Sequence, residues 1–297
     1  MDNFTLRQLR YFEALAQQGH FGRAADTCSI SQPALSVQIK ELEESLGVTL
    51  FERAARNIRL TAFGEDFAVR ARAILQSVDE LRDLARASRN AFSGKLRLGV
   101  IPTIAPYLLP RLLRDLGQAF PDLDIHIRET LTPRLLEELA DGRLDAAILA
   151  LPISIPSFTE VALFSESFYL VRHEDEAEHP VPSVDELHKE RLLMLEEGHC
   201  FRDQALAFCN LSAPTPREGL DGSSLSTLVQ MVGAGLGMTL IPEMAVYDEA
   251  KSAAVAVQPL GQGQPSRSVG MIWRSSTPLA DQFEEVAKLV KAAAIST

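Results

Sequence analysis

The chain has few cysteines, one tryptophan and a deficit of positive charge. Three cysteines in 297 residues are too few for a disulfide scaffold. The 29 lysines and arginines are outnumbered by 40 aspartates and glutamates, and this net charge of −11 argues at first against nucleic-acid binding. No run approaches the ~18 uncharged apolar residues of a membrane span, and no signal peptide is expected. We therefore expect a cytoplasmic protein without a membrane partner.

The net charge is unevenly distributed along the chain. Residues 1–90 carry 12 basic and 12 acidic residues, so the other 17 basic and 28 acidic residues account for the whole −11. The basic residues that cluster in the neutral segment are Arg23, Lys40, Arg53, Arg56 and Arg59. Because DNA affinity depends on local phosphate contacts, a neutral segment can still present a basic face. The charge objection to DNA binding is therefore weakened.

The first ninety residues have helical periodicity and few interruptions. Apolar spacing predicts helices at about 6–16 and 21–28, and Ser31 and Pro33 suit the start of a third helix that Gly47 ends. Residues 51–60 suit a short two-stranded wing. Thr61 then caps a long helix, to about residue 88, whose narrow apolar stripe favours a partner helix. The pattern predicts a winged helix-turn-helix over 1–62 and a linker and dimerisation helix over 63–92.

The third helix carries the residue types of a DNA-reading helix. In a helix-turn-helix, the second helix of the motif enters the major groove through its N-terminal residues. Gln32, Ser36 and Lys40 lie away from the apolar stripe and can reach base edges or phosphates. A three-helix bundle with a solvated polar face explains the same spacing, so periodicity alone leaves DNA binding open.

Strands and helices alternate beyond residue 93. The elements expected in the first unit are strands at 95–101, 123–128 and 144–151 and helices at 108–120 and 133–140. This order implies a parallel sheet with helices on both faces. The elements expected further on are strands at 191–195, 237–241 and 268–273 and helices at 222–233 and 281–294. We expect a region of two α/β units at 93–297, with subdomain I at about 93–164 and 268–297 and subdomain II at about 165–267.

Cys200 and Cys209 are nine positions apart in a segment of helical character. Nine residues of continuous helix span ~13.5 Å, whereas a disulfide requires Cα atoms within roughly 7 Å. A bond between them would remodel the backbone, which is the basis of a switch. Cys200 lies at an expected helix start, a setting that favours the reactive thiolate. Burial as small apolar side chains is the commoner fate of free cysteines, and the spacing lacks the ligands of a zinc site.

Residues 6–64 resemble the winged helix-turn-helix of LysR-type transcriptional regulators. The matching runs include Ser31-Gln32-Pro33-Ala34-Leu35-Ser36, Leu46-Gly47 and Leu50-Phe51-Glu52-Arg53. The α/β units resemble that family's effector domain of two subdomains, which is similar to a periplasmic binding protein, so the fold class is α+β multi-domain. The resemblance implies a homo-tetramer, a dimer of dimers, that binds promoter DNA and contacts RNA polymerase. The implied DNA-binding residues are Gln32, Pro33, Ser36, Lys40, Arg53 and Arg56.

Residues 197–209 resemble the redox loop of the hydrogen-peroxide-sensing branch of that family. By position, Cys200 is the implied peroxide-reactive thiol and Cys209 its resolving partner in a reversible disulfide. The implied peroxide-pocket residues are Thr103, Thr132, His199, Asp203 and Arg267, with Gln204 in support. The resemblance thus implies an activator of antioxidant genes, reset by a thioredoxin- or glutaredoxin-type reductant, with no cofactor, no metal and no enzymatic activity.

Two other functions remain open. The first is a LysR-type regulator that responds to a small-molecule effector while its cysteines stay passive. The second is a thiol peroxidase that turns peroxide over with a reductant, which the helix-turn-helix disfavours. A dinucleotide cofactor is not expected, because the G-x-G-x-G run at 233–237 lacks a strand before it and a helix after it.

Overall fold

The computed structural model describes residues 4–53, 58–87, 92–187, 190–208, 221–261 and 264–295. The chain divides into two compact units, Met1–Ala85 and Arg86–Thr297, which are described separately. Arg56 and Cys209 lie outside the described residues. Among the described helices, none combines the length and the hydrophobicity that a membrane crossing requires.

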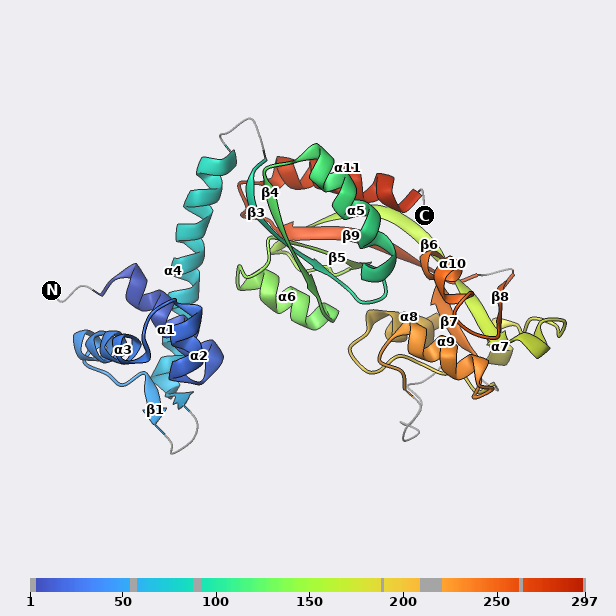
Figure 1. Ribbon diagram of the computed structural model, residues 1–297, viewed down its shortest axis with the longest axis horizontal. Helices are drawn as coiled ribbons and strands as arrows, with labels where there is room; N and C mark the ends of the chain where they lie inside the picture. Colours follow the sequence, from blue (N-terminus) through green and yellow to red (C-terminus); the bar gives the residue numbers. More distant parts are fainter. Residues whose placement is uncertain are drawn as a thin grey trace. The chain divides into compact units, whose positions relative to one another are not determined.

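The first unit is a helical head with a two-stranded wing (Figure 1). Its elements are α1 (Leu6–Gln18), α2 (Phe21–Thr27), α3 (Gln32–Leu46), β1 (Phe51–Arg53), β2 (Ile58–Leu60) and α4 (Ala62–Ala87). The ends of α3 follow the expected signals. Ser31 Oγ accepts a hydrogen bond from the Ala34 amide, and Gly47 ends the helix with φ at 68°. The helix-turn-helix and the antiparallel wing are therefore present as predicted.

The long helix α4 uses only part of its apolar surface within the head. Ala68, Ala71 and Leu75 are buried against the core that Phe12 centres, and Phe67 meets the Phe12 ring edge-on at 5.0 Å. A second set of apolar side chains on α4 is exposed: Phe63, Val69, Ile74, Leu81 and Leu84. The head thus leaves several large apolar side chains of α4 exposed.

The second unit is built on one seven-stranded mixed sheet. Its strands are β3 (Gly94–Val100), β4 (Leu123–Glu129), β5 (Ala146–Leu151), β6 (Phe158–His173), β7 (Thr239–Pro242), β8 (Val255–Pro259) and β9 (Ser266–Arg274). The order is β4-β3-β5-β9-β6-β7, with β8 also paired to β6. The expected parallel arrangement holds for β4, β3 and β5. It does not extend to β9, β6, β7 and β8, whose pairings are antiparallel.

Helices cover both faces of the β3–β5 part of the sheet. In Figure 1, α5 (Ala105–Ala119) and α11 (Ala280–Ile295) lie together on one face and α6 (Thr132–Ala140) on the other. The remaining helical elements are η1 (Glu174–Glu176), α7 (Val184–Leu187), α8 (Cys200–Phe208), α9 (Leu225–Gly233), η2 (Glu243–Ala245) and α10 (Val246–Glu249). Two cores result: the first core contains Trp273 and Phe283, and the second core contains Phe168 and Phe201.

The two most extensive differences from the sequence expectation concern residues 158–173 and residues 191–195. The sixteen-residue strand β6 was not expected; it pairs with β9 along Phe158–Ser167 and then with β7 and β8. The strand expected at 191–195 is reduced to two isolated bridges, Leu192 with Met238 and Leu195 with Gly222. Both differences depend on partners that are far away in the sequence.

Candidate functional site

Cys200 is a free thiol at the first position of α8. Its side chain packs against the first core, whereas the next residue, Phe201, is buried in the second core. Gly198 allows this approach, because its φ is 94° and a Cβ there would lie 2.9 Å from Leu131 Cδ1. The start of α8 therefore lies where the two cores meet.

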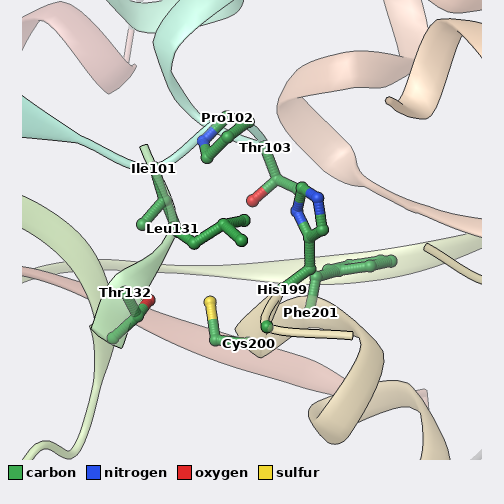
Figure 2. Close-up of a pocket in the computed structure, with 9 residues that line it drawn as sticks. Ile101, Pro102, Thr103, Leu131, Thr132, His199, Cys200 and Phe201 are labelled. Carbon is green, nitrogen blue, oxygen red and sulfur yellow. The ribbon is translucent and has the colours of Figure 1, made fainter. Parts of the chain in front are cut away.

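A small pocket opens beside the Cys200 sulfur. The space between its walls is narrow and partly open to solvent. Its lining residues are Ile101, Pro102, Thr103, Leu131, Thr132, Gly198, His199, Cys200 and Phe201. Figure 2 shows the sulfur directed toward Leu131, with Thr132 on one side and Thr103 and His199 on the other. The 101–103 and 131–132 segments follow the carboxyl ends of β3 and β4, where ligands of such sheets bind.

The pocket contains a polar atom without a protein partner. Thr132 Oγ1 is buried and has no hydrogen bond within the described part of the chain. Gln204 Oε1, one helical turn beyond Cys200, is also buried and has no hydrogen bond within the described residues. Buried hydroxyl and amide groups usually bind water or a ligand when the protein offers no partner. The Thr132 hydroxyl is therefore available to a small polar molecule in the pocket, whereas Gln204 is not among the lining residues.

Arg267 on β9 reaches the pocket through Thr103. Its Nη1 donates to Thr103 Oγ1 at 2.7 Å and its Nη2 to the Thr103 carbonyl at 3.1 Å. The guanidinium is fully buried and pairs with Glu166, whose Oε1 lies 2.7 Å from Nη2. It also lies 5.5 Å from the centre of the Phe201 ring. The arginine thus contacts two lining residues without lining the pocket itself.

His199 is 7% exposed and stands beside Thr103 in the pocket. Burial lowers its pKa from the ordinary value, although the nearby Glu196 carboxylate opposes this. The imidazole is therefore neutral at pH 7, with one nitrogen that donates and one that accepts. A neutral ring can take part in a proton transfer in either direction.

We expect His199 to make the stability of the protein depend on pH. Because its pKa is lower in the folded chain than in the unfolded chain, the unfolded state binds more protons between the two values. The free energy of unfolding should fall as the pH drops from 7.5 through that window. Urea unfolding at pH 7.5 and 5.5 measures this, and a His199→Gln variant should lose part of the decrease. An equal decrease in both proteins would contradict the assignment.

Asp203 does not join the pocket. It lies on the exposed side of α8 and is absent from the lining. Arg202, the nearest cation in sequence, is buried and turned away: its Nη1 donates to the Leu195 carbonyl at 2.6 Å and to Asp221 Oδ2 at 3.2 Å. Glu166 has no local signal in the sequence that marks it as part of this site, because its partner Arg267 lies 101 residues away. Within the described ranges, no three metal-binding side chains lie together.

The candidate DNA-reading residues share one face of α3. Gln32, Pro33 and Lys40 are exposed and Ser36 is half-buried. Lys40 Nζ forms an exposed pair with Glu44 at 3.4 Å, which is too weakly held to compete with a phosphate. Arg53 belongs to the wing strand β1, whereas Arg56 lies outside the described residues.

Both units match known protein families. Residues 6–65 match the family of bacterial regulatory helix-turn-helix proteins of the lysR type, and residues 89–294 match the LysR substrate binding domain. The chain belongs to the LysR family of bacterial transcription regulators. The expected fold class, an N-terminal helix-turn-helix followed by an α/β effector domain, is confirmed.

Within that family, the chain is similar to OxyR proteins. The DNA-binding transcriptional dual regulator OxyR of Escherichia coli K12 is 42% identical over 294 residues, covering 97% of this chain and 95% of the other. A full-length OxyR variant from Pseudomonas aeruginosa superimposes with a TM-score of 0.78 at 38% identity, covering 97% and 95%. An H2O2-bound OxyR variant from Corynebacterium glutamicum gives 0.65 at 36%, covering 99% and 95%. The resemblance to the peroxide-sensing branch is therefore confirmed.

Proposed function

We propose that this chain is a hydrogen-peroxide-sensing transcription activator of antioxidant genes and not an enzyme. Curated relatives at about 40% identity are named hydrogen peroxide-inducible genes activators, and one similar structure holds H2O2. The observation that carries the proposal is the pocket that Cys200 lines together with Thr132, whose buried hydroxyl has no hydrogen-bond partner in the described part of the chain. Peroxide carries a hydroxyl group at each end, so it can hydrogen-bond to this threonine while it approaches the sulfur.

The proposed first step is attack of the Cys200 thiolate on one peroxide oxygen. The S–O bond forms, the O–O bond breaks, and the departing hydroxide takes a proton to become water. Arg267 can only donate, so Thr103 Oγ1 accepts its hydrogen bond and keeps its own proton to donate to the leaving oxygen. Such a donor stabilises charge that develops in the transition state. The product is a sulfenic acid on Cys200.

The proposed second step joins Cys200 to Cys209. The Cys209 sulfur attacks the sulfenic sulfur, an S–S bond forms, and a second water leaves. Because α8 runs from Cys200 to Phe208, it must unwind before the two sulfurs meet. Unwinding would pull Phe201 from its contact with Phe168, whose ring centre is 4.7 Å away. The disulfide thereby couples chemistry to a change of fold, and a thioredoxin- or glutaredoxin-type reductant resets it.

Mass spectrometry after one equivalent of H2O2 tests the proposal. We expect the two peptides that contain Cys200 and Cys209 to be linked and Cys28 to remain reduced. Incubation with dithiothreitol should reverse the link. If Cys200 stays a free thiol, or if oxidation falls equally on all three cysteines, the peroxide-sensing function fails.

We further propose that α3 reads the major groove of promoter DNA. Gln32, Pro33 and Ser36 would face bases from its N-terminal half, while Lys40, Arg53 and Arg56 would contact phosphates. The exposed apolar side chains of α4, such as Ile74 and Leu81, would pack on a second copy, within a homo-tetramer that contacts RNA polymerase. The proposed limits are 1–62 for the head, 63–92 for the linker helix and 93–297 for the effector region, in a cytoplasmic protein.

Arg53→Ala is expected to weaken DNA binding by a similar factor for all sequences. Because the loss is one phosphate contact, the slope of log K against log salt should become shallower by about one unit. Gln32→Ala is the matched comparison, and it should change sequence preference instead. Fluorescence anisotropy with a specific and a scrambled duplex at several salt concentrations measures both. A loss confined to one operator base would contradict the phosphate assignment of Arg53.

A further inference from the structure

Glu166 is a buried acid that the proposed chemistry has not yet used. It lies on β6 directly opposite Arg267 on β9, in the register of the two paired strands. Its side chain is 5% exposed and that of Arg267 is 0% exposed. A carboxylate this deeply buried is retained in a charged form only when its partners satisfy it.

Both carboxylate oxygens of Glu166 have partners. Oε1 accepts from Arg267 Nε at 2.8 Å and faces Nη2 at 2.7 Å. Oε2 accepts from the backbone amide of Met244, in η2, at 3.0 Å. The Met244 amide therefore fixes one oxygen of the Glu166 carboxylate, and the other oxygen fixes the Arg267 guanidinium.

The other side of the same guanidinium meets Thr103. Nη1 reaches the Thr103 hydroxyl at 2.7 Å, and Nη2 reaches the carbonyl of the same residue. A planar guanidinium has its donors in a fixed arrangement, so the orientation set by Glu166 determines where Nη1 points. The contacts form a continuous chain from Met244 through Glu166 and Arg267 to a residue that lines the pocket.

We propose that Glu166 is a positioning residue for the reaction of Cys200 with peroxide, an inference that rests on the proposed function. Glu166 aims Arg267 at Thr103, and the occupied Thr103 oxygen directs its hydroxyl proton into the pocket. Glu166 also balances the buried charge of Arg267. A purely structural ion pair between β6 and β9 is the competing explanation, and it predicts no selective effect on peroxide.

The test compares two rates at Cys200 in the full-length protein. Oxidation by H2O2 needs the aligned Thr103 hydroxyl, whereas alkylation by iodoacetamide needs only an accessible thiolate. In Glu166→Gln the amide keeps the size of the side chain but can satisfy only Arg267 or Met244. We expect the H2O2 rate constant to fall about tenfold, less than the 10²–10³ of an oxyanion donor removed outright. The alkylation rate should stay within about twofold.

Two controls separate positioning from loss of stability. Glu249 is equally buried and accepts hydrogen bonds from Tyr107 and Ser226, away from the pocket lining. Glu249→Gln should leave the ratio of the two rates unchanged. In a Thr103→Val background, Glu166→Gln should have almost no further effect on the H2O2 rate, because the group it positions is gone.

Each outcome decides one question. Equal losses in oxidation and alkylation, or an unchanged H2O2 rate, would overturn the positioning role. Additive effects of Glu166→Gln and Thr103→Val would overturn the route through Thr103. A wild-type Cys200 that reacts with H2O2 no faster than Cys28 would instead overturn the proposed function itself.

Discussion

Replacing Cys200 by serine is expected to abolish the response of a target promoter to hydrogen peroxide. The hydroxyl keeps the size of the side chain, but it forms neither a thiolate nor a sulfenic acid, so no disulfide can follow. Reporter transcription with and without peroxide measures the response, and a gel shift with operator DNA shows whether the variant still binds. We expect full loss of induction with DNA binding retained.

Cys28→Ser is the matched control for this experiment. Cys28 is a free cysteine packed against the core of the head, and burial raises the pKa of its thiol, which keeps it protonated at neutral pH. Its replacement should leave induction intact. A Cys200→Ser protein that still responds to peroxide would favour a regulator with passive cysteines. Peroxide consumption far beyond the amount of protein, with thioredoxin present, would favour a thiol peroxidase.

Among single substitutions near the pocket, Arg267→Met is expected to lower the free energy of unfolding the most. The substitution leaves Glu166 buried, charged and without its cation, and breaking a buried pair from one side costs about 3–5 kcal/mol. Urea unfolding of the full-length protein measures the loss. The variant should also react slowly with peroxide, because Thr103 loses the donor that orients it.

The double variant Glu166→Met with Arg267→Met separates these two effects. Removing both charges leaves no unpaired ion, so much of the stability should return. The peroxide rate should stay low, because nothing then donates to Thr103. A double variant as unstable as Arg267→Met would contradict the ion-pair explanation, and one as reactive as wild type would contradict the role of the arginine.

Local signals in the sequence predicted the local parts of the fold. Ser31 and Gly47 define the ends of α3 because capping needs only neighbouring backbone groups. In the same way, the start of α8 at Cys200 follows from the short segment around it. Thr103, Thr132 and His199 were expected together from a resemblance to a known family, and the structure brings them to one pocket.

The features that could not be predicted depend on contacts outside the local segment, some of them with residues far away in the sequence. The polar residues of β6 interrupt its apolar alternation, and its two glutamates find partners outside the strand. Glu160 accepts from the Ile153 and Ser154 amides, and Glu166 pairs with Arg267. Asp203 was expected in the pocket by position, yet the helical phase of α8 that points Cys200 inward leaves Asp203 in solvent. The spacing of residues in the sequence does not determine which side of α8 faces inward. The packing of Phe201 in the second core determines it.

The continuity of β6 determines where the effector unit can deform. One strand pairs with β9 and then with β7 and β8, so turning one core against the other would bend a hydrogen-bonded strand. The chain before α8 meets its neighbours through isolated bridges at Leu192 and Leu195 and not through a continuous strand pairing. We therefore expect the effector unit to deform more readily around α8 than between its two cores. Oxidation of Cys200 is expected to change the surface around α8. The two cores are expected to keep their orientation relative to each other.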